Sequence, residues 1–88
     1  MKIPRTVKIG AHTILVDEVE FGDDSNLCGD NAYVEGRIRL NKALPQTQKE
    51  ASFIHEAMHT MNTTLDHSLL DSLAEQMYQF LHDNDLLK

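Results

Sequence analysis

The sequence predicts an α+β domain in which a small antiparallel sheet of three to four N-terminal strands packs on two C-terminal helices. Up to residue 41, short segments rich in β-branched residues are separated by turn-forming residues. After Pro45, apolar residues recur with the period of a helix. The 88 residues suffice for one domain, residues 1–88, and the 41% hydrophobic content is typical of a folded chain.

Four segments of the first half have the character of strands. Residues 6–9 and 13–16 are rich in valine, isoleucine and threonine, and Gly10 between them predicts a hairpin turn. Residues 27–34 are a candidate for a third strand. Residues 37–40 alternate arginine with an apolar residue, which predicts a half-buried or edge strand.

A first helix is predicted over residues 48–61. Thr47 and Glu50 have the spacing of a capping box at its start. Its apolar stripe consists of Ala51, Ile54, Ala57, Met58 and Met61.

A second helix begins after a cap at Thr64 or Asp66 and ends near residue 83. Its apolar stripe is centred between Leu73 and Met77. The stripe consists of Leu69, Leu70, Leu73, Ala74, Met77, Phe80 and Leu81. We expect Met58, Met61 and Met77 to fill the core between the two helices.

The charge pattern disfavours two classes of partner. The chain has 14 acidic and 8 basic residues and a net charge of −6. Nucleic-acid-binding proteins present a basic stripe, whereas the basic residues here form no cluster beyond Arg37 and Arg39. No apolar run approaches the ~18–20 residues that span a bilayer. We therefore expect no nucleic-acid partner and no membrane partner.

Cys28 is the only cysteine, so the chain forms no internal disulfide. A small domain without disulfides is typical of the cytoplasm, and a bound metal is one way to stiffen such a domain. We expect Cys28 itself to be a small buried apolar residue.

The most informative segment is His55-Glu56-Ala57-Met58-His59, which has the pattern H-E-x-x-H. It falls inside the predicted first helix, where residues four apart lie on one face. The two imidazoles can therefore converge on one Zn²⁺ at ~2.0–2.1 Å. Glu56 can take a proton from a metal-activated water, so His55 and His59 are predicted metal ligands and Glu56 the catalytic base.

A catalytic zinc takes a third protein ligand, and we expect it from the second helix. The candidates are His67, Asp71 and Glu75. On a helical wheel, Asp71 borders the apolar stripe, whereas Glu75 faces water. His67 also lies on the flank, in the first turn. We therefore favour Asp71, with His67 and Glu75 as alternatives.

Three consecutive segments together resemble the ImmA/IrrE-like zinc metallopeptidases: a strand at 36–41, a short proline-containing connection, and the segment from Phe53 to His59. The likeness covers most of the chain and is greatest to the small versions encoded by phages and prophages. In that family an acid in a following helix, within a pattern like E-x-x-A-N, is the third ligand. Asp71 stands at that position and Ala74 matches, while Asp71 replaces Glu and Glu75 replaces Asn.

The resemblance implies a minimal zincin-like fold and a cytoplasmic hydrolase in a bacterial host, encoded by a phage or prophage. It also implies a peptide or protein substrate, with regulatory cleavage as its role. The strand at 37–40 would lie at the cleft, where an edge strand can pair with an extended peptide. The alternative function is a non-catalytic zinc-binding interaction module of phage origin.

Three further side chains need an assignment. Tyr78 lies on the same flank as Asp71 and could donate a hydrogen bond to an oxyanion, but we expect it at the edge of the core. His12 and His82 are expected at the surface.

Overall fold

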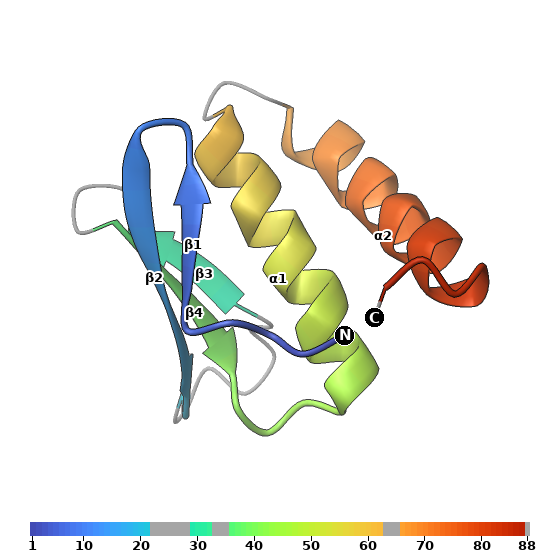
Figure 1. Cartoon of the computed structure of the whole chain (residues 1–88), viewed down its shortest axis with the longest axis horizontal. Coiled ribbons are helices and arrows are strands. Elements are labelled where there is room, and N and C mark those ends of the chain that lie inside the picture. The colour runs from blue at the N-terminus through green and yellow to red at the C-terminus, as the bar shows by residue number, and fades with distance from the viewer. Residues whose placement is uncertain (22–28, 33–35, 63–65, 88) are drawn as a thin grey trace.

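The structure is a computed structural model that describes residues 1–21, 29–32, 36–62 and 66–87. A sheet, a first helix and a second helix lie one behind the other as three layers (Figure 1). This arrangement confirms the predicted α+β class. In chain order the elements are β1 (Thr6–Ile9), β2 (His12–Val19), β3 (Gly29–Ala32), β4 (Arg37–Asn41), α1 (Gln46–Met61) and α2 (His67–Asp83).

The strands form one sheet in the order β1-β2-β4-β3. The pairs β1–β2 and β3–β4 are antiparallel, as expected, but β2 and β4 pair in parallel, so the sheet is mixed. Residues 20–36 lie between those two strands, which is long enough for the crossover that a parallel pair requires.

Residues 37–40, predicted as a half-buried or edge strand, form a half-buried inner strand. β4 lies between β2 and β3, and the edges of the sheet are β1 and β3. Ile38 and Leu40 face the helix layer and are fully buried, whereas Arg39 on the other face is exposed. Alternation of polar and apolar residues indicates that one face of a strand is buried. It does not indicate whether the strand has a hydrogen-bonded neighbour on both sides.

The hairpin at the start of the chain is confirmed. Ile9 pairs with His12 across a two-residue turn, and Gly10 has a φ of 62°. This is the left-handed region that glycine enters without steric cost. The third strand spans Gly29–Ala32, within the predicted 27–34, and the other residues of that prediction lie outside the described ranges.

Helix α1 begins two residues earlier than predicted, at Gln46. Its N-cap is Pro45, with no side-chain hydrogen bond, so the capping box expected from Thr47 and Glu50 does not form. Glu50 is instead buried and accepts a hydrogen bond from Tyr78. Glu50 therefore pairs with Tyr78 on α2 and not with the backbone at the start of its own helix.

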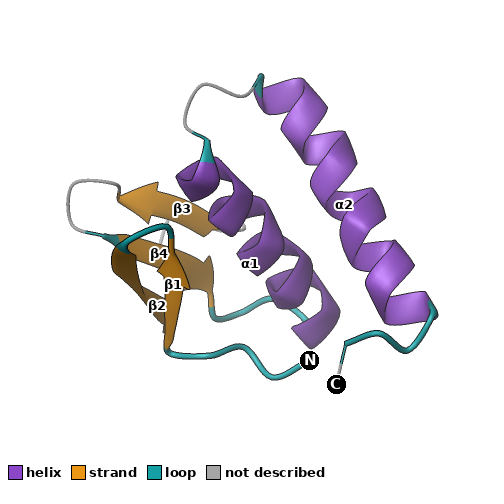
Figure 2. Cartoon of the chain, turned by 45° about the horizontal axis from the view of Figure 1, so that its top comes forward, coloured by secondary structure: helices purple, strands orange, loops and turns teal. Residues whose placement is uncertain are grey.

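Helix α2 begins where Asp66 caps it. The carboxylate of Asp66 accepts a 3.0 Å hydrogen bond from the backbone N–H of Leu69, and the helix runs to Asp83, as predicted. Within the described ranges, α2 contacts α1 and none of the strands (Figure 2).

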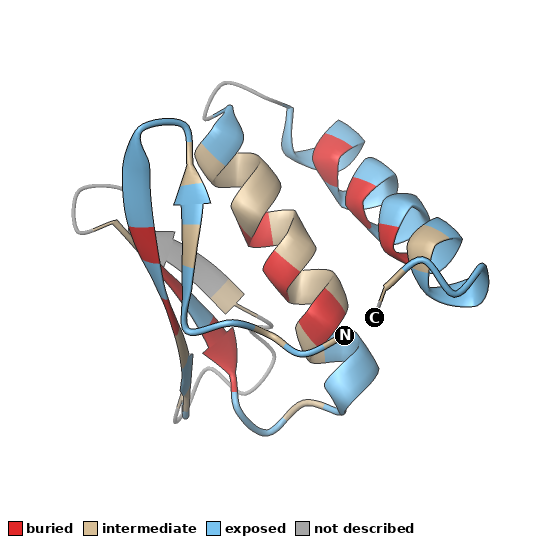
Figure 3. Cartoon of the chain, viewed as in Figure 1, coloured by how far each residue is buried: buried red, intermediate tan, exposed pale blue. Residues whose placement is uncertain are grey.

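The buried face of α2 differs from the predicted centre of its stripe. Leu70, Ala74 and Tyr78 are buried, while Leu73 and Met77 are 46% and 42% exposed (Figure 3). The stripe is wider than one neighbouring helix can cover, and the small side chain of Ala74 marks the side that packs on α1. Met58 is half-buried, but Met61 is 66% exposed, so neither Met61 nor Met77 fills the core as predicted.

The main core lies between the sheet and α1. Its buried residues are Ile14, Val16, Ile38, Leu40 and Phe53. Among the residues described, no helix combines the length and apolarity needed to cross a membrane. Cys28, expected to be buried, lies outside the described residues.

Candidate metal centre

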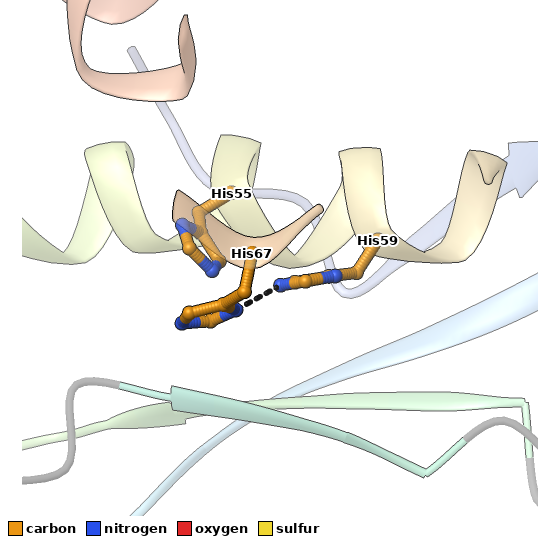
Figure 4. A group of neighbouring side chains, drawn as sticks. All are labelled: His55, His59 and His67. Atoms are coloured by element: carbon orange, nitrogen blue, oxygen red, sulfur yellow. Dashed lines mark hydrogen bonds between the residues drawn. The ribbon is translucent and has the colours of Figure 1, made fainter. Parts of the chain in front are cut away.

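Three histidines from the two helices lie together. His55 and His59 are one helical turn apart on α1, and His67 is the first residue of α2. Their side chains point toward one another (Figure 4), and one nitrogen from each lies within 4.8 Å of the other two. His59 Nε2 and His67 Nδ1 lie within hydrogen-bond distance of each other, at 3.2 Å.

The local sequence explains why these rings meet. The i, i+4 spacing places His55 and His59 on the same face of α1. The cap at Asp66 fixes the first turn of α2 next to the last turns of α1, and His67 follows that cap directly. The third histidine is therefore positioned by the cap that begins α2.

Asp71 contacts two of the three rings. Its Oδ1 lies 3.1 Å from Nδ1 of His55 on α1, and its Oδ2 lies 3.4 Å from Nε2 of His67, one turn earlier on α2. Its side chain is 52% exposed. The sequence favoured Asp71 as the third metal ligand. Its carboxylate lies against the histidines, although it is not part of the group of three ligand atoms that the histidines form.

Glu75, the remaining candidate ligand, is exposed. Among the described residues, the ligand atoms that gather within 4.8 Å belong to the three histidines, and those of Asp71 and Glu75 are not part of that group. The histidine that stood as an alternative therefore lies in the cluster.

Glu56 lies on the side of α1 that faces the sheet. It is 8% exposed, and its Oε2 lies 3.8 Å from Nε2 of His55. A Cβ added at Gly29 of the edge strand would lie 3.6 Å from Cγ of Glu56. The side chain of Glu56 thus lies between His55 and β3, the strand at the sheet edge.

The pKa values of two of the imidazoles are lowered. For His55, burial lowers the pKa, and the nearby Asp71 carboxylate opposes part of this effect. For His59, burial lowers the pKa, and the neighbouring His55 and His67 lower it further. Both rings therefore favour the neutral form, which is the form that binds a metal.

The donor set fits a divalent metal ion. Bonds of ~2.0–2.1 Å in a tetrahedron separate two ligand nitrogens by about 3.3 Å, close to the 3.2 Å between His59 and His67. Three neutral imidazoles together could hold such an ion, and a tetrahedral ion would keep a fourth position for water.

Tyr78, His12 and His82 lie outside the histidine cluster, as predicted. The hydroxyl of Tyr78 donates to Glu50, about 16 Å along α2 from His67, so it is not directed at the histidine cluster. His12 and His82 are exposed, as predicted.

Sequence reasoning missed two features of the site. One is the double contact of Asp71, which depends on the angle and offset of the two helices. The other is the close approach of Gly29 to Glu56, two residues that are far apart in the sequence. A glycine within a strand was the only available signal for the second feature, because such a glycine often marks close backbone approach.

No family model matches this chain, and comparisons with curated proteins and with solved structures give no match either.

Proposed function

We propose that the protein is a zinc-dependent peptidase that hydrolyses a bond in a peptide or protein substrate. The observation that carries this proposal is the convergence of three imidazoles beside the buried carboxylate of Glu56. His55, His59 and His67 would hold the metal.

The donor set favours zinc. Imidazole nitrogens suit Zn²⁺, whereas Mg²⁺ and Ca²⁺ prefer oxygen ligands. Catalytic zinc sites use three protein ligands and keep a fourth position for water or substrate. The three histidines meet that requirement.

Zinc, when bound, lowers the pKa of a water to ~7 and polarises the scissile carbonyl. Glu56 would take a proton from the attacking water and return it to the leaving nitrogen. Its position supports this role, because its Oε2 lies 3.8 Å from the His55 nitrogen that would face the metal. Its burial keeps bulk water away from the carboxylate.

The edge strand β3 is the element best placed to hold a substrate. Peptides can bind by adding a strand to a free sheet edge through backbone hydrogen bonds. The sheet ends at β3, which contacts α1, and Gly29 brings that strand close to Glu56. The sequence suggested residues 37–40 as the strand that pairs with a peptide substrate. We propose β3 for that role instead, because β3 is the edge strand next to Glu56.

The resemblance to ImmA/IrrE-like peptidases supports a biological setting for this activity. On that basis we propose a cytoplasmic enzyme of phage or prophage origin that performs a regulatory cleavage in a bacterial host.

Metal content and cleavage test the proposal together. The protein is loaded with Zn²⁺, dialysed and analysed for metal, and a library of extended peptides is screened for cleavage by mass spectrometry. We expect one zinc per chain in the wild type and loss of zinc in His59→Ala. Glu56→Gln should keep the zinc and lose cleavage by about 100-fold or more.

Asp83→Asn is the matched control, because Asp83 is an exposed acid at the far end of the neighbouring helix. It should retain both zinc and cleavage. Equal zinc in His59→Ala and wild type, or undiminished cleavage by Glu56→Gln, would contradict the proposal.

One observation favours a second function, a non-catalytic zinc-binding module. The carboxylate of Asp71 is close enough to two rings that it could close the fourth position of the metal. Such a site has no need of Glu56. A Co²⁺-substituted protein distinguishes the two, because only an open site changes its visible spectrum when azide is added.

A further inference from the structure

The two oxygens of Asp71 contact different rings, and each contact uses the ring nitrogen on the outer side of the cluster. Oδ1 lies 3.1 Å from Nδ1 of His55, and Oδ2 lies 3.4 Å from Nε2 of His67. An ionised carboxylate only accepts hydrogen bonds and has capacity for both. These are ion-pair distances, and each ring can donate an N–H to Asp71 when it carries its proton on that outer nitrogen.

Such donation would select one tautomer of each imidazole. A neutral ring that donates through one nitrogen carries a lone pair on the other. In His55 that nitrogen is Nε2, which lies beside Glu56. In His67 it is Nδ1, which lies 3.2 Å from His59 Nε2. The nitrogens left to bind metal are the ones that face the centre of the cluster.

We infer that Asp71 is a shared positioning residue, which orients one metal-binding histidine on each helix and does not itself bind the metal. The inference rests on the proposed zinc site. Metal-binding histidines commonly donate their second N–H to a carboxylate, and losing that partner costs 10–100-fold in metal affinity. Here the carboxylate of Asp71 would orient both His55 and His67, and its contact with His55 also joins α2 to α1.

The alternative is that Asp71 is the third ligand, as the sequence favoured. Its oxygens would then have to leave both outer nitrogens, and His67 would stand outside the coordination shell. The two arrangements predict opposite effects of substitution at Asp71 and at His67.

The experiment uses the full chain with Zn²⁺ and Co²⁺ as the probes. Zinc affinity is measured by competition with a chelator, and the visible Co²⁺ spectrum at saturation reports the ligand set. We expect Asp71→Asn to weaken zinc binding 10–100-fold with an unchanged Co²⁺ spectrum. His67→Ala should alter the spectrum and weaken binding more.

Asp83→Asn, at an exposed acid at the far end of α2, is the matched control and should leave both affinity and spectrum unchanged. Nitrogen-15 NMR of the zinc-loaded wild type gives an independent readout, and it should show His55 protonated at Nδ1 and His67 protonated at Nε2. Because Asp71 is half-exposed, Asp71→Asn should melt within about 2 °C of the wild type without metal.

The inference is overturned if Asp71→Asn changes the Co²⁺ spectrum while His67→Ala does not, since Asp71 is then a ligand. It is also overturned if Asp71→Asn binds zinc as tightly as Asp83→Asn does. Failure of the proposed zinc site has a different signature, because the wild type itself would then bind no zinc.

Discussion

Tyr78 on α2 donates a 3.0 Å hydrogen bond to Glu50 on α1, and both residues are buried. Burial acts to raise the pKa of Glu50, but hydrogen bonds from Gln46 and Tyr78 and the amino group of Met1 outweigh it and lower the pKa overall. Asp71 links the same two helices near the histidines. The helix pair is thus joined by polar contacts at two places, one structural and one at the candidate metal centre.

Replacing Tyr78 with Phe should destabilise the fold by about 1–3 kcal/mol, because the buried Glu50 carboxylate loses a donor. Urea unfolding measures the effect. Phe80→Leu is a control on the same helix, at a residue that is 54% exposed, and should change stability by less than about 1 kcal/mol. Equal stabilities of the two variants would mean that the hydrogen bond contributes little.

Alkaline pH should weaken the fold through the same tyrosine. Burial and the hydrogen bond to Glu50 raise the pKa of Tyr78 to about 12, from an ordinary value of 10.0. Because the folded-state pKa is the higher one, this contribution is complete below pH 10.0 and is lost as the pH rises toward 12.

The loss amounts to on the order of 2 kcal/mol. Urea unfolding at a series of pH values from 8 upward should show it in the wild type. Tyr78→Phe removes the group, so its stability should depend less on pH over the same range. An identical pH dependence in both proteins would assign the effect to other groups.

Leu70→Ala and Leu73→Ala should differ in stability, because only one of the two leucines is fully buried against α1. Leu70 is fully buried against α1, so its truncation leaves a cavity and should cost about 2–5 kcal/mol. Leu73 is 46% exposed, and its truncation should cost less than about 1 kcal/mol. Thermal unfolding of the pair gives the comparison, and a larger loss in Leu73→Ala would contradict the observed packing.

Gly29→Ala should impair the proposed cleavage, because the added Cβ would lie 2.8 Å from the backbone oxygen of Arg39 and 3.6 Å from Cγ of Glu56. The strand must shift, at a cost of about 1–3 kcal/mol. We expect lower cleavage activity at a temperature where the variant remains folded.

The matched control is Gly10→Ala. Its Cβ would meet nothing within 4 Å, but the φ of 62° is strained for alanine, so stability should fall by about 1–2 kcal/mol. Gly10 lies in the hairpin turn, so cleavage should be unchanged in the folded protein. A parallel loss of activity in both variants would show that stability, and not the approach of β3 to Glu56, controls activity.

The elements that depend on local patterns were the most predictable. The hairpin at Gly10, the helix that contains His55 and His59, and the cap at Asp66 all follow from interactions within about four residues. The failed capping box at Thr47 shows the limit of such rules, since Glu50 found a buried partner on the other helix instead.

The sequence by itself determined the α+β class and the placement of two histidines and a glutamate on one helix, because periodicity and i, i+4 spacing are local properties. The tertiary structure decided that β4 is an inner strand, that Leu70 and not Leu73 faces α1, and that His67 and Asp71 both reach the site. These outcomes depend on strand pairing and on the packing of two helices, which bring together groups that no local pattern relates.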